Sequence, residues 1–200
     1  QVLQYIFMVL VTTGLGFGLT YAFGYKDAEE EVTEAKEVVE ANEAAAPVLS
    51  DETIVSPIVG QVVDLKDVND PVFSSGAMRQ GIAVKPSEGV VYAPADAEVT
   101  IAFATGHAYG LKTANGAEIL IHVGIDTVSM NGDGFDQKVA QGDKVKAGDV
   151  LGTFDTAKIA ATGLDDTTMV IVTNTADYAS VIPVAEGVVA KGDAVIELKA

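Results

Sequence analysis

Two histidines are the side chains of this 200-residue chain best suited to chemistry, and its composition includes no other histidine. His107 lies in the sequence TGHAYG, and His122 lies in ILIHVGIDTV. Imidazole titrates near neutral pH, so one ring nitrogen is a free nucleophile in the cell. Two facing imidazoles suit the transfer of a phosphoryl group, because that reaction depends mainly on alignment and on charge stabilisation.

Residues 117–123 have the alternating pattern of a strand, which directs His122 to the face opposite three β-branched residues. These three are Ile119, Ile121 and Val123. An isolated histidine in a strand is usually only a structural residue. A second histidine at position 107, with Thr105 before it, and Asp126 four positions after His122 favour a functional site instead.

The two rings can meet only if His107 lies on the strand next to residues 117–123 in a hairpin. We expect them to face each other across a shallow depression. A hydrogen bond from one nitrogen of His122 to a backbone carbonyl would fix its tautomer. The His107 ring, oriented by the Thr105 hydroxyl, would then donate to the phosphoryl oxygens.

The part of the chain that must position these residues, 53–200, has the pattern of an all-β domain. Short β-branched runs recur, separated by Gly, Asp, Asn and Pro every eight to twelve residues. This spacing favours a sandwich or a barrel over βαβ units. One short helix is predicted over residues 155–165. The pairs Gly142-Asp143 and Gly192-Asp193 indicate related turns and an internal duplication.

The first 52 residues have a different character. Residues 1–25 carry no charge, and about 20 apolar residues at about 1.5 Å rise span a bilayer core of roughly 30 Å, so a transmembrane helix is predicted. Residues 26–52 contain ten acidic residues and two lysines, and we interpret them as a flexible acidic linker. Because the chain begins with Gln1, we expect it to be the C-terminal piece of a longer protein.

Composition excludes several classes of function. The chain contains no cysteine, which excludes disulfides, thiolate metal sites and a cysteine nucleophile. Its formal net charge is −17, of which the linker accounts for −8, and −9 remains for residues 53–200. Nucleic acid is not an expected partner, because phosphate binding needs clustered Lys and Arg. A basic protein surface would be attracted.

Three runs resemble the glucose-type IIA domain of the bacterial phosphoenolpyruvate:sugar phosphotransferase system, and the likeness extends over residues 55–200. They are residues 56–86, 93–135 and 142–155. The stretch ILIHVGIDTV is the most specific, and the resemblance makes His122 the phosphorylated histidine, His107 the second active-site histidine and Thr105 its hydroxyl partner. It also implies a phosphotransferase with a phosphohistidine intermediate, a compact antiparallel β-sandwich of the duplicated hybrid-motif type, and no metal or other cofactor.

The same resemblance implies a docking surface. Acidic residues that meet arginines of partner proteins are Asp70 and Asp126, and an apolar rim is formed by Val72, Phe73, Met78 and Phe103. Core packing is an equally good reading of each apolar residue. The sequence departs from the family at Gly106, where Asn is expected, and at Leu120, where an aromatic residue is frequent.

In the family, the phosphoryl donor is the phosphocarrier HPr and the acceptor is a cysteine of a IIB domain. Some permeases fuse their domains in the order IIB, membrane IIC and IIA. Residues 1–25, 26–52 and 53–200 resemble the last IIC helix, a linker and the IIA domain of such a fusion, in the sucrose, trehalose or β-glucoside branch. The resemblance therefore implies a location at the cell membrane, with the IIA domain on the cytoplasmic side.

Two alternatives involve other chemistry. His122 and Asp126 match the H-x-x-x-D motif of lysostaphin-type zinc peptidases, but no histidine follows His122, and catalytic zinc needs about three protein ligands. The run GDKVKAGDVLGTFD resembles turns of biotinyl or lipoyl carrier modules, but Lys144 and Lys146 lack the context of a modified lysine. A regulatory role in binding other transporters or enzymes is a third possibility.

Overall fold

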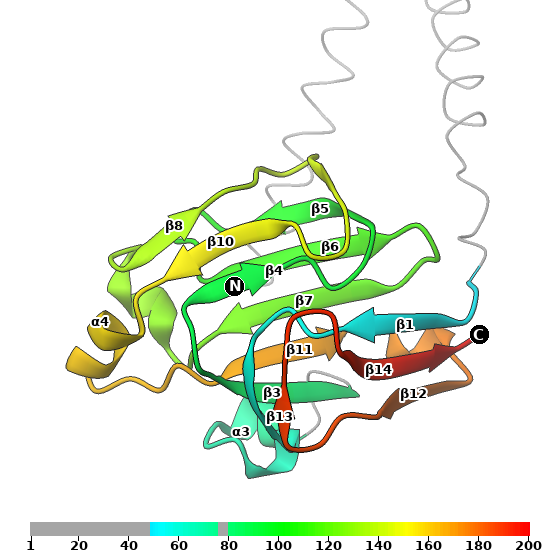
Figure 1. The fold of residues 1–200 in the computed structure, drawn as a ribbon, viewed down its shortest axis with the longest axis horizontal. Helices are drawn as coiled ribbons and strands as arrows, with labels where there is room; N and C mark the ends of the chain where they lie inside the picture. The colour runs from blue at the N-terminus through cyan, green and yellow to red at the C-terminus, as the bar shows by residue number, and fades with distance from the viewer. Residues whose placement is uncertain (1–48, 76–79) are drawn as a thin grey trace, which may run out of the picture. The chain divides into compact units, whose positions relative to one another are not determined.

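Antiparallel β-strands make up most of the described chain, residues 49–75 and 80–200, in this computed structural model (Figure 1). The strands are β1 (Glu52–Val55), β2 (Gly60–Val63), β3 (Gln80–Pro86), β4 (Val90–Tyr92), β5 (Ala97–Ala102), β6 (Ala108–Thr113), β7 (Glu118–Val123), β8 (Phe135–Gln137), β9 (Lys144–Val145), β10 (Val150–Phe154), β11 (Thr168–Val172), β12 (Ser180–Pro183), β13 (Val188–Val189) and β14 (Ala194–Lys199). The all-β class predicted from the sequence is therefore confirmed.

The strands form one large sheet and two small ones. The large sheet has the order β13-β2-β3-β11-β7-β6-β5-β9, and the small sheets have the orders β1-β14-β12 and β4-β10-β8. Each pair of neighbouring strands is antiparallel. Short helices connect them: η1 (Leu65–Asp67), α3 (Pro71–Ser74), η2 (Thr127–Met130), α4 (Thr156–Ala161) and η3 (Thr175–Asp177).

The main core lies between the large sheet and both small sheets. The residues of β7 predicted to share one face, Ile119, Ile121 and Val123, are buried in it. They belong to the same apolar cluster as Leu151 of β10 and Leu198 of β14. Burial on this face sets the register of β7, because a shift by one residue would move the apolar set to the other face.

A second, smaller cluster covers the other face of the large sheet. Met169 and Ile171 of β11 and Ala83 of β3 are buried there under Phe73 of α3. Leu120 of β7 packs partly buried against this cluster. Because side chains alternate along β7, this is the face that also carries His122, as the sequence predicts.

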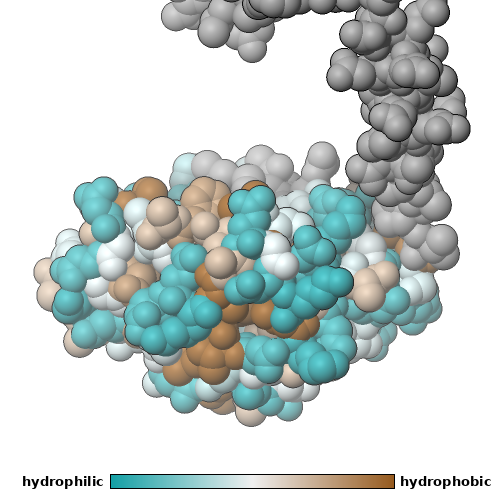
Figure 2. All heavy atoms as spheres, turned by 90° about the horizontal axis from the view of Figure 1, so that it is seen from above, coloured by the Kyte–Doolittle hydropathy of each residue, from teal (hydrophilic) through white to brown (hydrophobic). Residues whose placement is uncertain are grey.

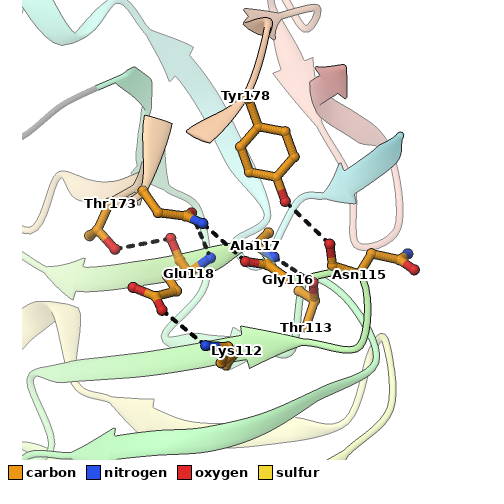
Figure 3. Close-up of polar contacts among 9 residues, drawn as sticks. Lys112, Thr113, Asn115, Gly116, Ala117, Glu118, Thr173 and Tyr178 are labelled. Carbon is orange, nitrogen blue, oxygen red and sulfur yellow. Dashed lines mark hydrogen bonds and ion pairs between the residues drawn. The ribbon is translucent and has the colours of Figure 1, made fainter. Parts of the chain in front are cut away.

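The turn between β6 and β7 is held by hydrogen bonds from within the hairpin and from outside it (Figure 3). The Asn174 side chain donates to Gly116 O (3.0 Å) and accepts from Glu118 N (2.9 Å). The Thr113 hydroxyl accepts from Ala117 N (3.0 Å). These contacts stabilise the register in which Ala108 pairs with His122 at the far end of the hairpin.

The predicted helix over residues 155–165 is present but shorter. The Asp155 carboxylate caps α4 by accepting from Ala157 N and Lys158 N, both at 3.0 Å. The helix ends at Ala161, and Gly163 follows with a left-handed φ of 78°, a conformation that glycine adopts at little cost.

The related turns have the same geometry in both halves of the domain. Asp143 accepts from Ala140 N and Asp193 accepts from Ala190 N, each at 2.8 Å. Gly142, which precedes Asp143, has the same φ of 90° as its counterpart in the second turn. The repeated turn agrees with the sequence pattern, while the duplication itself stays a prediction.

The predicted transmembrane helix over residues 1–25 lies outside the described residues, as does the linker up to residue 48. No helix within residues 49–75 and 80–200 is long and apolar enough to cross a membrane. The folded domain starts slightly earlier than position 53, because β1 begins at Glu52 and Asp51 forms an ion pair with Lys199 at 3.0 Å.

Candidate functional site

His122 lies on β7, between β6 and β11, with its ring at the edge of the smaller apolar cluster. The side chain is partly buried, and its ring centroid is 5.4 Å from that of Phe73. Its Nδ1 is 2.9 Å from the carbonyl oxygen of Gly124. A carbonyl oxygen can only accept, so Nδ1 carries the proton of the neutral ring. The lone pair is therefore on Nε2, the nitrogen available as a nucleophile.

His107 lies directly before β6 and faces His122, as the hairpin prediction requires. The backbone carbonyl of His107 accepts from Val123 N (2.8 Å), which fixes the two chains side by side. The two imidazole centroids are 5.0 Å apart, with an interplanar angle of 82°. The Thr105 hydroxyl oxygen is 2.5 Å from His107 Nδ1. The structure thus brings together all three residues predicted to carry the chemistry.

A tight turn before His107 gives its ring this position. Gly106 has a left-handed φ of 69°, and its N–H donates to Phe103 O (2.7 Å). Asn tolerates this conformation better than most residues, so Gly106 and the Asn expected from the family resemblance both suit this turn. A Cβ at this position would lie 3.0 Å from Cβ of Phe135, which must then shift slightly.

Burial favours the neutral form of both rings. Burial, together with the nearby His122 ring, lowers the pKa of His107 to about 4. It also lowers the pKa of His122, although the Gly124 carbonyl and the negative charges of Asp70 and Asp126 oppose that shift. At neutral pH both rings are therefore uncharged, the state in which an imidazole nitrogen is nucleophilic.

The two acidic residues predicted to flank the site lie near it at the starts of two short helices. Asp70 precedes α3, and its carboxylate accepts from Phe73 N (3.2 Å). Asp126 precedes η2 in a left-handed conformation, with φ of 58°, and it is exposed. The negative charges of both carboxylates raise the pKa of His122 against the effect of burial.

The predicted apolar rim is only partly found. Phe103 is 42% exposed and its ring is 5.4 Å from that of His107. Phe73 is only 8% exposed and belongs to the smaller apolar cluster, which agrees with the core-packing reading of this residue. Val72 belongs to α3, and Met78 lies outside the described residues.

One residue of the site, Gly124, was not identified from the sequence. Gly124 provides the carbonyl that accepts from His122, and its φ of 75° requires a residue without a side chain. A Cβ there would lie 2.4 Å from Cγ2 of Thr127 and 2.8 Å from Asp165 O. The glycine directly after a histidine-bearing strand was the available signal. No local sequence pattern indicates that Gly124 lies against residue 165.

Comparison with known proteins gives the family. Residues 52–178 match the family described as "phosphoenolpyruvate-dependent sugar phosphotransferase system, EIIA 1". The chain belongs to this family. It is 46% identical over 141 residues to the glucose-specific EIIA component of Bacillus cereus, which covers 70% of the chain and 85% of that protein. The EIIA domain is therefore a phosphoryl carrier and a phosphotransferase component of a sugar phosphotransferase system.

Longer relatives match the EIIA domain and additional residues. The β-glucoside-specific EIIBCA component of Dickeya chrysanthemi is 44% identical over 170 residues, which is 84% of the chain but 27% of that protein. The chain thus spans about a quarter of this relative. Among solved structures, glucose permease IIA from Mycoplasma capricolum matches with a TM-score of 0.69 and 34% identity, over 75% of the chain and 97% of that structure.

These findings do not support the alternatives. The matching family and the relatives named above are sugar phosphotransferase components, not zinc peptidases or biotinyl or lipoyl carriers. Within residues 49–75 and 80–200, no group of three or more His, Cys, Asp or Glu is arranged to hold a metal ion.

Proposed function

We propose that Nε2 of His122 accepts a phosphoryl group from phosphorylated HPr and passes it to a cysteine of a IIB domain. One observation carries this proposal. The Gly124 carbonyl engages Nδ1 of His122 at 2.9 Å, which leaves Nε2 unprotonated beside the second imidazole.

Each step exchanges one bond to phosphorus for another. In the first step the Nε2 lone pair forms a bond to phosphorus as the phosphorus–nitrogen bond of the donor histidine breaks, and the donor nitrogen keeps the electron pair. In the second step a cysteine thiolate forms the new bond as the bond to Nε2 breaks. No redox partner is needed, and alignment is the main requirement.

His107 stabilises the charge during both transfers. If the Thr105 hydroxyl donates to Nδ1 of His107, its Nε2–H is free to donate to a phosphoryl oxygen. The 5.0 Å between the ring centroids leaves this donor next to the group bound on His122.

The docking surface for HPr and IIB surrounds the two rings. Asp70 and Asp126 attract arginines of the partners, and exposed Phe103 contributes apolar contact. By the family resemblance, Val72, Phe73 and Met78 also contribute to this surface.

The chain is the C-terminal piece of a fused permease, with a membrane helix at residues 1–25 and an acidic linker at 26–52. The β-glucoside-specific EIIBCA component of Bacillus subtilis matches over 178 residues, more than the 148 of positions 53–200. The likeness to such components therefore extends into the first segments. By this likeness the sugar is a β-glucoside or a related sugar, and the domain lies on the cytoplasmic side of the membrane.

Phosphoryl labelling of variants tests the roles of the two histidines. With phosphorylated HPr as donor, His122→Ala should accept no label, because it lacks the nucleophile. His107→Gln should still be labelled but pass the group to IIB about 100-fold more slowly, since it lacks the imidazole donor. The label should be acid-labile and base-stable.

Wild-type chain and the variant Gln61→Ala, changed at an exposed position of β2, serve as controls. Full labelling of His122→Ala would overturn the assignment of the nucleophile. Transfer from His107→Gln at the wild-type rate would overturn the assignment of the helper.

A further inference from the structure

One peptide group connects His122 to a turn about forty residues away in the sequence. The carbonyl of Gly124 accepts from His122 Nδ1, and the N–H of the same peptide group, on Ile125, donates to Asp165 O (2.8 Å). A trans peptide is planar, with its C=O and N–H pointing in opposite directions. The hydrogen bond to Asp165 therefore sets the direction in which the Gly124 carbonyl points.

The neighbouring peptide is held by the same turn. Gly124 N donates to Thr167 O at 3.1 Å, so residues 165–167 bind both amides that flank Cα of Gly124. A Cβ at position 124 would lie 2.8 Å from Asp165 O, which shows how closely the two segments approach.

The carboxylate of Asp165 closes this turn. Its Oδ1 accepts from Thr167 N (2.8 Å) and from the Thr167 hydroxyl (2.7 Å). Burial raises the pKa of this carboxyl, but the bonds from Thr167 and Lys85 outweigh that effect and leave it below its ordinary value. The carboxylate is therefore ionised and shapes the backbone of its own turn.

Lys85 anchors the turn to the sheet. Its Nζ lies 2.9 Å from Asp165 Oδ1 and 2.6 Å from Asp166 Oδ1. Lys85 belongs to β3, which pairs with β11, and β11 pairs in turn with the strand of His122. The ion pairs thus join the turn to the same rigid sheet that carries the nucleophile.

We propose that Asp165, anchored by Lys85, is a positioning residue that orients the Gly124 carbonyl and thereby keeps His122 in the Nδ1–H tautomer. Neither side chain needs to touch the phosphoryl group. The inference rests on the proposed role of His122 as phosphoryl acceptor, and it assigns to this chain a support for that role that lies outside the two histidines.

Removing the carboxylate should loosen the tautomer. In Asp165→Ala the turn loses both bonds to Thr167, the Gly124 carbonyl gains freedom, and the alternative Nε2–H tautomer of His122 becomes populated. That tautomer has no lone pair on the attacking nitrogen. A misplacement of this kind should reduce phosphoryl transfer from HPr by about 10-fold to 100-fold.

Two measurements on the full 200-residue chain test this inference. The ¹⁵N chemical shifts of the His122 ring report the tautomer in the unphosphorylated protein, and labelling with phosphorylated HPr reports the rate. We expect Asp165→Ala to change both. Asp165→Asn should restore the wild-type tautomer, because its amide oxygen can still accept from Thr167 N and from the Thr167 hydroxyl.

Asp51→Ala is the matched control. Like Asp165, Asp51 accepts from a backbone N–H, that of Ala200, and from a lysine, Lys199. It directly precedes β1, away from the histidines. It should keep the wild-type tautomer and rate. Equal shifts and rates in wild type and Asp165→Ala, or the same loss in Asp51→Ala, would overturn the inference.

If Asp165→Ala does not fold, substitutions of Lys85 and of the control residue Lys199 test the inference. Lys85→Met should lower the transfer rate at least about threefold and perturb the His122 shifts, whereas Lys199→Met should do neither. Identical behaviour of the two lysine variants would contradict the inference. If the wild-type chain takes no phosphoryl group on His122, the proposed function fails instead, and the tautomer measurement still tests the positioning role separately.

Discussion

Burial gives the two imidazoles properties that free histidine lacks. The side chain of His107 is only 4% exposed, and its pKa of about 4 keeps it neutral at physiological pH. In the proposed mechanism, a neutral His107 donates a hydrogen bond to the phosphoryl group without repelling the His122 ring. This hydrogen bond strengthens as negative charge builds on the phosphoryl oxygens. In the proposed mechanism, the Thr105 hydroxyl engages Nδ1 of His107 and leaves Nε2 of that ring to face the phosphoryl group.

The low pKa of His107 predicts a loss of stability in acid. Its ordinary pKa is 6.5 and its folded value is about 4, so the unfolded chain binds a proton more readily between these values. The free energy of unfolding is therefore unaffected by His107 above pH 6.5. It falls as the pH drops from 6.5 towards 4, by at most about 3 kcal/mol, because protonation favours the unfolded chain. Urea unfolding at pH 7 and pH 4.5 measures this loss.

His107→Gln is the comparison for that prediction. It should lose less stability than the wild type over the same pH interval, although His122, whose pKa is also lowered, still contributes. Equal losses in the two proteins would show that His107 is not the group responsible.

The elements place the rings by fixing the register of one hairpin from its opposite end. Thr173 and Asn174 follow β11 and bind the turn that joins β6 to β7, and Tyr178 donates to Asn115 O (3.5 Å) in the same turn (Figure 3). A slip of one residue would separate the histidines and expose the core face of β7.

Asn174→Ala tests this role of the turn. The change leaves Gly116 O and Glu118 N without their side-chain partner, so we expect a loss of about 1–2 kcal/mol in the free energy of unfolding. Urea unfolding measures it. Gln61→Ala, which removes a single exposed bond of 3.3 Å to Val62 O, should change stability little, and an equal effect of the two substitutions would contradict the prediction.

The alternation of apolar and polar residues predicts a strand and its buried face well where that alternation is regular. The run ILIHV alternates clearly, and both the orientation of His122 and the buried face of β7 follow from it. Strand β6, AYGLKT, has no such alternation and is buried along most of its length, so its place beside β7 was inferred only from the histidines. The contact between Asp165 and Ile125 joins distant loops, and no local pattern indicates it.

Charge and exposure decide how the whole molecule meets its partners. Residues 53–200 carry a formal charge of −9, and the face shown in Figure 2 is mostly hydrophilic with a narrower hydrophobic band between. In the proposed docking surface around the histidines, the carboxylates of Asp70 and Asp126 would supply charge attraction and the exposed Phe103 apolar contact. Such a surface favours a basic partner and fast association.

Asp70→Arg tests this electrostatic docking. Replacing the carboxylate by a cation should weaken the binding of HPr strongly at low salt and less at high salt, because ions screen exposed charges. Titration calorimetry at two ionic strengths measures the difference. Asp51→Arg, a similar charge change away from the site, is the control, and an unchanged affinity of Asp70→Arg at low salt would count against the docking surface.

The atom that carries the phosphoryl group tests the account most directly. Two-dimensional ³¹P–¹⁵N NMR on the chain phosphorylated by HPr identifies the bonded nitrogen. We predict a single phosphorus–nitrogen bond, to Nε2 of His122, since the Gly124 carbonyl holds Nδ1. A phosphoryl group on Nδ1 of His122, or on His107, would contradict the account.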